Sequence, residues 1–195
     1  MTKILIAFYS TYGTNHAIAD AAAEAAKAVG ADVRLRRFAE TAPKDVVEGQ
    51  DAWKAENERQ QSIQEIGHDD MEWAEGIWIS SPTRYGGAAS QVRAFFDTLG
   101  PLWQQGKLMN KAVTASASAQ NKNGGVEMTL QNLYTAVAHW GSIIVPAGYG
   151  SDVKFEDGGN PYGFSTTAGG IDETGRKSIA YQAERLVTFT KKIAG

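Results

Sequence analysis

Residues 3–15 hold the feature that most constrains the fold. A short, continuously apolar run from Ile4 to Tyr9 stops at a polar turn, Ser10–Asn15, and an alanine-rich helical pattern follows from Thr14 to Val29. A continuously apolar strand is typical of a parallel sheet that is covered on both faces. A turn between such a strand and a helix gathers backbone N–H groups and hydroxyls at the helix N-terminus, where a phosphate is stabilised. The stretch therefore predicts an α/β fold with a phosphate site at the end of its first strand.

The alternation of strand and helix continues to the end of the chain. Further strands are predicted at 33–37, 76–80, 112–118 and 141–145, and further helices at 89–99, 126–140 and 177–193. Because strands and helices alternate, we expect a three-layer α/β fold, in which a doubly wound, five-stranded parallel sheet lies between helices and the crossovers are right-handed. A length of 195 residues suits one domain, spanning 1–195.

Two stretches do not fit this alternation. An insertion at about 42–70 is rich in Glu, Gln and Asp and carries one large aromatic side chain, Trp53; a surface helix and an exposed insertion explain it equally well. A segment at about 146–175 holds eight glycines and few apolar residues, which predicts a long loop, either ordered or disordered. Loops of this length inside compact domains are usually functional when they are ordered.

Composition argues against several classes of function. The net charge of −3 comes without a concentrated basic patch, which disfavours nucleic-acid binding. The chain has no cysteine, which excludes disulfides, a thiolate nucleophile and a cysteine metal site, and a reducing cytoplasm is the expected location. No apolar run approaches the roughly 18 residues of a membrane helix, and no secretory signal is recognisable.

Three polar segments follow the first, third and fourth predicted strands: Ser10–Asn15, Ser81–Gly87 and Ala119–Gly125. Parallel strands end at one edge of the sheet, where the ligands of doubly wound folds bind. The first segment offers hydroxyls, an amide and one glycine, which suits a monophosphate held by neutral donors. It lacks the lysine of a GxxxxGK[ST] loop and no GxGxxG lies near, which disfavours ATP hydrolysis and a dinucleotide Rossmann site. An ordinary strand-to-helix turn with a threonine cap is the alternative.

The second segment could wrap a flat ring, with Tyr85 stacking on it, although Arg84 could equally be a solvated side chain. Trp103 and His139 are further candidates. Simple core or interface packing is the alternative for Trp103, and a lone histidine late in a helix is most often structural. No Ser-His-Asp set is present, and the acidic cluster at His68 lacks partners at metal-ligand spacing, so neither a hydrolase nor a metalloenzyme is supported.

Several motifs occur in order along nearly the whole chain: Tyr9–Gly13, Ser81–Gly86, Phe95–Asp97 with Gly100–Trp103, Ala138–Gly141, Ile144–Tyr149, and Pro161–Gly163 with Thr167–Gly170. Together they resemble the WrbA family, the flavodoxin-like type IV NAD(P)H:quinone oxidoreductases, historically named tryptophan-repressor-binding proteins. The resemblance implies the flavodoxin-like strand order 2-1-3-4-5, FMN as a bound cofactor and NADH or NADPH as a substrate. The third loop departs from the family, because Ser118–Gly125 is bulkier, slightly longer and carries Lys122.

The resemblance also implies site residues. The FMN phosphate maps to Ser10, Thr11, Tyr12, Gly13, Thr14 and Asn15, and the isoalloxazine ring is bordered by Pro82, Thr83, Arg84, Tyr85 and Gly86. The third loop contributes Ser118, Ala119, Gln120, Asn121, Gly124 and Gly125, and His139 completes the FMN site. Tyr12 and Trp103 map to positions that contact the nicotinamide or substrate, and Trp103 and His139 are the implied catalytic residues.

The implied activity is two-electron reduction of quinones by NAD(P)H, in a ping-pong reaction in which hydride passes through N5 of the flavin. Trp103, Tyr12 and Tyr85 are expected to form a stacking slot for planar substrates, and His139 to donate a hydrogen bond or a proton to the reduced quinone. The resemblance further implies a homodimer or homotetramer, with no metal, nucleic acid or membrane insertion. A single-electron flavodoxin-type carrier and a regulatory, repressor-binding protein with FMN as a structural ligand are the alternatives.

Overall fold

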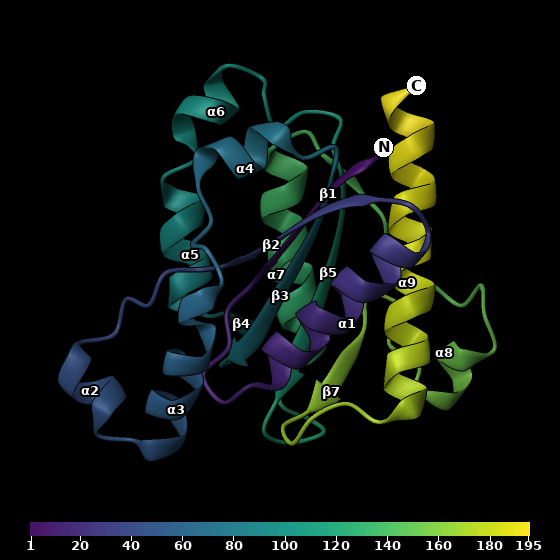
Figure 1. Ribbon diagram of the computed structural model, residues 1–195. Coiled ribbons are helices and arrows are strands. Elements are labelled where there is room, and N and C mark those ends of the chain that lie inside the picture. The colour runs from purple at the N-terminus through teal and green to yellow at the C-terminus, as the bar shows by residue number, and fades with distance from the viewer.

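Five parallel strands form the main path of a seven-stranded sheet, and this path is the sheet that the sequence predicts. The computed structural model describes all 195 residues. Its sheet has the order β2-β1-β3-β5-β6 (Figure 1), formed by β1 (Lys3–Phe8), β2 (Asp32–Arg37), β3 (Gly76–Arg84), β5 (Ala112–Ala119) and β6 (Ile143–Ile144). All four pairs on this path are parallel. Counted in chain order, the parallel strands run 2-1-3-4-5, so the predicted flavodoxin-like order is confirmed.

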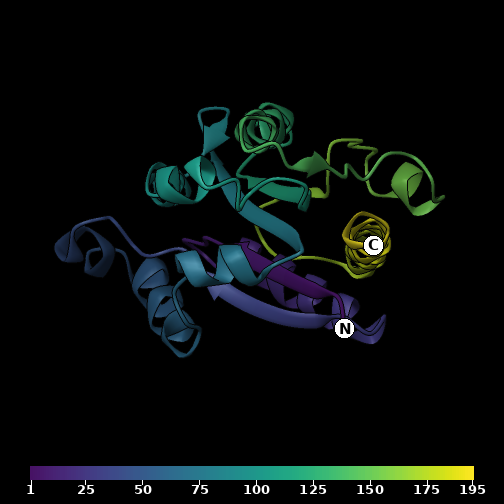
Figure 2. The same cartoon turned by 90° about the horizontal axis from the view of Figure 1, so that it is seen from above.

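Helices cover both faces of the sheet (Figure 2). One face is covered by α1 (Thr14–Ala28) and α9 (Glu173–Ala194), which pack against each other. The other face is covered by α5 (Ser90–Asp97) and α7 (Val126–His139), with two short helices, α4 (His68–Trp73) and α6 (Gly100–Gln104), adding to the same core. No helix is both long enough and apolar enough to cross a membrane.

The first strand shows why its sequence is apolar without interruption. Side chains of a strand alternate between the two faces of a sheet. Ile4, Ile6 and Phe8 accordingly pack in the core beneath α1 and α9, whereas Leu5 and Ala7 pack in the core beneath α5 and α7. Because both faces are covered, every position from 4 to 8 is buried.

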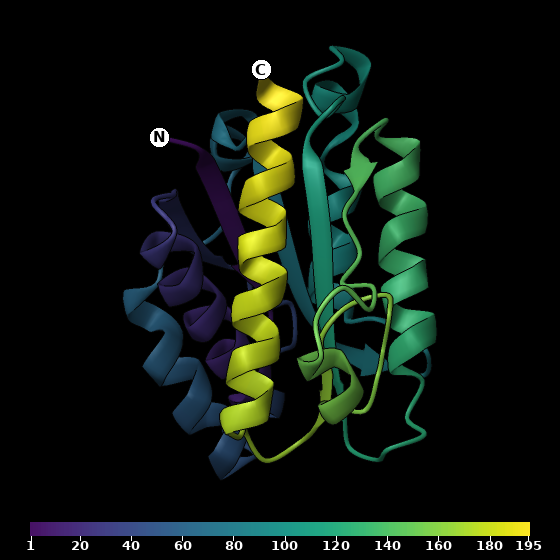
Figure 3. The same ribbon diagram turned by 90° about the vertical axis from the view of Figure 1, so that its right-hand side faces the viewer.

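The strands that pair with the outer side of β5 differ from those that the sequence predicts. A single fifth strand was expected at 141–145, but two short strands share this edge (Figure 3). β6 pairs with the start of β5, and β7 (Ser165–Thr167) pairs with its end. The intervening chain leaves the sheet and carries α8 (Val153–Glu156). The glycine-rich segment at 146–175 is therefore ordered and supplies a strand, because its backbone completes the edge that β6 leaves open.

The insertion at 42–70 is mostly helical. It contains α2 (Lys44–Glu48), α3 (Asp51–Arg59) and a turn of 3-10 helix, η1 (Gln60–Ser62), before α4 begins. Figure 1 shows α2 and α3 at the lower left, beside the end of the sheet at which α1 starts. The surface-helix alternative is thus correct. The insertion lies beside the carboxyl ends of the parallel strands, where the polar turns are.

Candidate functional site

A pocket of about 510 Å³ opens at the carboxyl ends of β1, β3 and β5. Three segments form most of its wall: the first turn (Ser10–Asn15), the second turn (Pro82–Gly86) and the third loop (Ser118–Gly125). The lining residues are Ser10, Thr11, Tyr12, Thr14, Asn15, Trp53, Pro82, Thr83, Arg84, Ser118, Ala119, Gln120, Asn121, Gly124 and Ala168. The sequence-predicted segments therefore meet around one cavity, as the topology of a doubly wound sheet requires.

The first turn presents the N-terminus of α1 to this pocket. Gly13 precedes the helix with a φ of 95°, a left-handed conformation that glycine adopts without steric cost, and its N–H donates to Ser10 Oγ at 3.0 Å. The first N–H groups of a helix have no partner within the helix, so those of α1 remain available to an anion. Gly13 itself lies behind the pocket, where an added Cβ would come within 3.3 Å of Arg59 and Glu56.

Asn15 joins the first turn to β3 and to the third loop. Its Nδ2 donates to Ser118 Oγ at 2.7 Å, and its Oδ1 accepts a hydrogen bond from Ser80 Oγ at 3.1 Å. Asn15 is 1% exposed, so these bonds are shielded from water. The amide thus fixes the start of α1 against the ends of β3 and β5, and this holds the floor of the pocket rigid.

The second turn is the tip of a hairpin. β3 continues through Pro82 to Arg84 and pairs antiparallel with β4 (Gly87–Ala88). Tyr85 and Gly86 form the tip with φ values of 52° and 81°, and Tyr85 is fully exposed. Neither tip residue lines the pocket of its own chain, because the hairpin extends them away from the sheet.

Arg84 carries the one formal charge in the pocket lining. Its Nη2 donates to Thr11 Oγ1 at 2.8 Å, which bridges the second turn to the first. Behind Thr11 lies Tyr9, whose hydroxyl donates to Glu40 Oε2 at 2.8 Å. Burial, reinforced by the nearby Glu40 carboxylate, raises the pKa of Tyr9 well above its ordinary value. The phenol therefore stays protonated and continues to donate.

The third loop reaches the pocket through Ser118–Asn121 and Gly124. Gly124 packs directly on Ala119, and Gly125 begins α7 with a φ of 87° close against the backbone of Gly86. Lys122, which distinguishes this loop from the family pattern, does not line the pocket, and neither does Gly125.

Trp103 and His139 lie at the opposite end of the sheet, near the amino ends of the parallel strands. His139 ends α7, a helix of 14 residues that begins beside the pocket at Gly125, so it lies about 20 Å from that end. The helix α6 lies at the top of Figure 1, and its Trp103 donates from Nε1 to the carbonyl oxygen of His139 at 2.9 Å. Both side chains are exposed, Trp103 to 58%. A single chain therefore does not bring them to the pocket, because a helix that follows a strand runs back to the strand's amino end.

Two residues that line the pocket, Trp53 and Ala168, were not predicted from the sequence to do so. Trp53 reaches the pocket from α3, and its isolation as the one aromatic residue of a polar insertion was the available signal. Ala168 follows β7, where the N–H of Gly169 donates to Thr14 Oγ1 at 3.5 Å. The glycine-rich segment thus touches the first turn, which no local pattern indicates.

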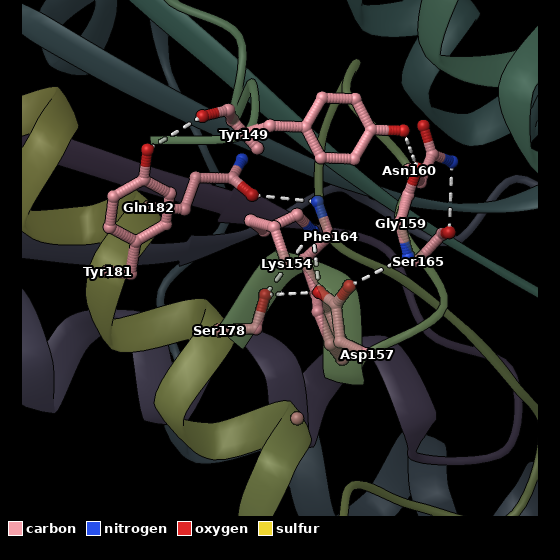
Figure 4. Close-up of polar contacts among 12 residues, drawn as sticks. Tyr149, Lys154, Asp157, Gly159, Asn160, Phe164, Ser165, Ser178, Tyr181 and Gln182 are labelled. Carbon is pink, nitrogen blue, oxygen red and sulfur yellow. Dashed lines mark hydrogen bonds and ion pairs between the residues drawn. The ribbon is translucent and has the colours of Figure 1, made fainter. Parts of the chain in front are cut away.

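Polar contacts with α9 hold the glycine-rich segment in place (Figure 4). Lys154 is completely buried and forms an ion pair with Asp157, which also accepts a hydrogen bond from Ser178 of α9. The side chain of Gln182, also in α9, accepts a hydrogen bond from the N–H of Phe164 at 2.7 Å. These contacts position the chain that enters β7 and, through it, Ala168 at the pocket.

The donor set of the pocket fits FMN. Hydroxyls, amides and backbone N–H groups surround the N-terminus of α1, one arginine supplies positive charge, and no carboxylate lines the cavity. A phosphate dianion suits such donors, and the second turn and third loop leave space beside it for a flat ring. These donors therefore favour an organic phosphate ligand. No group of three or more His, Cys, Asp or Glu side chains is arranged to hold a metal ion.

A doubly wound sheet with this pocket at its switch point defines a flavodoxin-like protein. Residues 3–157 match the family described as NADPH-dependent FMN reductase, so the chain belongs to that family. It is 54% identical over 195 residues to the NAD(P)H dehydrogenase (quinone) of Deinococcus radiodurans, covering 99% of this chain and 98% of that protein. The chain is thus a member of the WrbA family of NAD(P)H:quinone oxidoreductases, and the resemblance drawn from its motifs is confirmed.

Solved structures agree on the fold. A WrbA-like flavodoxin protein from Agrobacterium tumefaciens superposes with a TM-score of 0.69 at 17% identity, over 99% of each chain. A flavodoxin from the domain Archaea gives a TM-score of 0.65 at 15% identity, over 97% of this chain and 99% of that one.

Proposed function

We propose that the protein is an FMN-dependent NAD(P)H:quinone oxidoreductase. The observation that carries this proposal is the pocket at the carboxyl ends of β1, β3 and β5, where neutral donors and one arginine surround the N-terminus of α1. The Deinococcus relative, at 54% identity, bears the name of this activity. The proposal treats residues 1–195 as one flavodoxin-like domain.

The residues of this chain bind and orient. The first turn holds the phosphate through Ser10, Thr11 and Thr14 and through the free N–H groups of α1, and the dipole of this helix adds about 0.3–1 kcal/mol. Arg84, fixed by Thr11, offsets part of the ligand's negative charge. FMN, when bound, supplies the two-electron redox chemistry, so the reaction needs no side-chain nucleophile from the pocket.

Trp103 and His139 act, in this proposal, on the pocket of another copy of the chain. Both are exposed, and a groove of about 340 Å³ between α5 and α7 includes His139 beside Phe96 and Trp140. A homodimer or homotetramer would bring this surface to a neighbour's second turn, whose Tyr85 projects freely. Trp103 then stacks on a planar substrate, and His139 supplies a hydrogen bond or proton to the reduced quinone.

The absence of cysteine accords with a reducing compartment, and we include the cytoplasm in the proposal on that ground. The pocket shows no cluster of cations that would select a nicotinamide 2′-phosphate, so the proposal covers both NADH and NADPH.

The decisive experiment is a titration of the purified protein with FMN followed by NADH oxidation with and without benzoquinone. We expect saturable flavin binding and turnover that requires both FMN and the quinone. FMN binding without quinone turnover would favour the single-electron carrier, and absence of FMN binding would refute the proposal. Sedimentation across a range of protein concentrations, compared with the activity of Trp103→Ala, tests the role of the second copy. A concentration-independent monomer would contradict that role.

A further inference from the structure

Trp53, on the inserted helix α3, is an aromatic wall of the pocket that lies within the same chain. Besides the 57%-exposed Tyr12, it is the one aromatic side chain among the lining residues. Unlike Trp103 and the hairpin tip, Trp53 needs no second copy of the chain to reach the cavity. Its ring is partly buried between the first turn and the insertion.

A carboxylate fixes the orientation of the Trp53 ring. The indole Nε1 donates to Glu40 Oε2 at 3.1 Å. The same carboxylate accepts hydrogen bonds from Tyr9 OH at 2.8 Å and from Gln91 Nε2 at 2.6 Å. Because these donors come from α3, from the residue after β1 and from α5, Glu40 joins the insertion to the end of the sheet. A tryptophan held by its ring nitrogen in this way presents one defined surface to the pocket.

Hydrogen bonds connect the segment that carries Trp53 to the first turn. At its start, Tyr12 OH donates to Gln50 Oε1 at 2.6 Å. Beyond its end, Gln60 Nε2 donates to the carbonyl oxygen of Ser10 at 2.8 Å. Between them, the buried pair His16 and Glu56 brings Nδ1 and Oε1 to 2.7 Å. Contacts on both sides of Trp53 therefore tie α3 to the backbone that forms the proposed phosphate site.

We propose that Trp53 contacts the ring system of bound FMN and that Glu40 is the positioning residue that holds it there. The proposal rests on the FMN binding proposed above. It assigns a binding role to the insertion, whose composition is explained equally well by a surface helix or an exposed insertion. A flat, electron-poor flavin ring is the chemistry that an oriented indole beside a phosphate site recognises best.

The test uses Trp53→Phe, which keeps an aromatic ring but removes the electron-rich indole. An indole in contact with a flavin quenches its fluorescence by electron transfer, and phenylalanine does not. With FMN bound at saturation, and with Trp103 replaced by Phe in every protein compared so that its indole cannot also quench, we expect the flavin fluorescence of Trp53→Phe to rise severalfold above that of the protein that retains Trp53. The FMN Kd of Trp53→Phe should change by less than about threefold, whereas Trp53→Leu should bind about tenfold more weakly.

Trp73→Phe is the matched control, because Trp73 lies in α4, where it packs against Arg34 and not against the pocket. This variant should leave both readouts unchanged. Glu40→Gln should raise the bound-flavin fluorescence when Trp53 is present and leave it unchanged in the Trp53→Phe background, because Glu40 acts through Trp53. A purely structural role of either residue would not move the fluorescence at saturation.

Oxidative footprinting of the wild-type protein gives an independent readout that needs no variant. FMN should protect Trp53, and not Trp73, from hydroxyl-radical oxidation. If the wild type binds FMN but Trp53→Phe shows unchanged bound-flavin fluorescence and FMN gives Trp53 no protection, the contact does not exist and the inference is refuted. If the wild type binds no FMN, the proposed function fails first, so the two failures are distinguishable.

Discussion

Replacing Asn15 with aspartate should abolish tight FMN binding while the protein stays folded. Asn15 is the second residue of α1 and lines the pocket at the point where the phosphate is proposed to lie. Aspartate keeps the size of the side chain and the acceptor that faces Ser80. It loses the donor to Ser118, whose hydroxyl can rotate and donate to the new carboxylate instead.

The magnitude follows from the charges. At about 4–5 Å and an effective dielectric constant of about 20, two unit charges repel by about 3–4 kcal/mol. The phosphate carries between one and two negative charges, so about 3 kcal/mol is a conservative estimate, and this weakens FMN binding more than a hundredfold. In the absence of FMN, the buried carboxylate costs free energy of desolvation, which the N-terminus of the helix (about 0.3–1 kcal/mol) and the hydroxyl donors Ser80 and Ser118 offset in part.

The assay is a flavin-fluorescence titration at pH 8 alongside thermal unfolding of the FMN-free protein. Asn15→Ala is the control, because it adds no charge but removes both hydrogen bonds, which should destabilise the fold by about 2–4 kcal/mol. Asn15→Asp should thus bind FMN more weakly and yet unfold at a higher temperature than Asn15→Ala. If Asn15→Asp bound FMN within threefold of the wild type, the phosphate would not lie at the N-terminus of α1 and the reasoning would fail.

Three further changes test the surroundings of the site. Lys154→Met leaves the buried Asp157 carboxylate without its ion-pair partner and should lower the free energy of unfolding, measured in urea, by about 3–5 kcal/mol. The double variant Lys154→Met with Asp157→Leu should recover most of this loss. Gly163→Ala would drive a Cβ into the carbonyl oxygen of Ala115, so we expect a loss of about 1–3 kcal/mol, visible as a lower Tm; an unchanged Tm would contradict this packing. Burial by itself raises the pKa of Glu40, but hydrogen bonds outweigh it and lower this pKa below the ordinary 4.5. The ionised carboxylate therefore adds stability that is complete above the unfolded-state pKa and is lost as the pH falls through the lower folded-state pKa. Below about pH 4.5, the free energy of unfolding of the wild type should fall more steeply with pH than that of Glu40→Gln. Parallel plots of unfolding free energy against pH would refute this.

The sheet could be predicted because its information is local. Burial on both faces demands a continuous apolar run in each central strand, as at Ile4–Phe8 and Ile77–Ile79, and the connecting helices carry apolar faces of their own. Strand order followed from the resemblance, and the polar segments after three strands located the pocket. These signals depend on residues that are adjacent in the sequence or separated by one helical turn.

The placement of α3 could not be predicted, because it depends on pairs far apart in the chain. Gln60 meets the backbone of Ser10 across 50 positions, and Glu56 meets His16 across 40. The helix contributes little apolar surface, so its sequence has no periodic pattern that would reveal which face is buried. Trp53 therefore appeared as an isolated aromatic residue, although it lines the pocket.

The positions of Trp103 and His139 relative to the pocket could be predicted from the order of strands and helices, in addition to the motifs. His139 ends a helix that starts beside the third loop, and such a helix in a doubly wound fold returns to the amino ends of the strands. The strand and helix pattern by itself thus places His139 away from the pocket of its own chain. Motifs identify which residues recur in a family, whereas the topology decides which chain's pocket they can reach.

These placements separate the two kinds of contact that we propose with the ring of bound FMN. Trp53 is held within its own chain by Glu40 and α3, whereas Trp103 and His139 can reach a pocket only from another copy. Dilution to the monomer should therefore abolish quinone turnover but preserve the difference in bound-flavin fluorescence between the wild type and Trp53→Phe, provided that FMN stays saturating. If this difference and turnover were lost together on dilution, Trp53 would depend on the assembly, and the insertion would act at a contact between chains instead of as a wall of its own pocket.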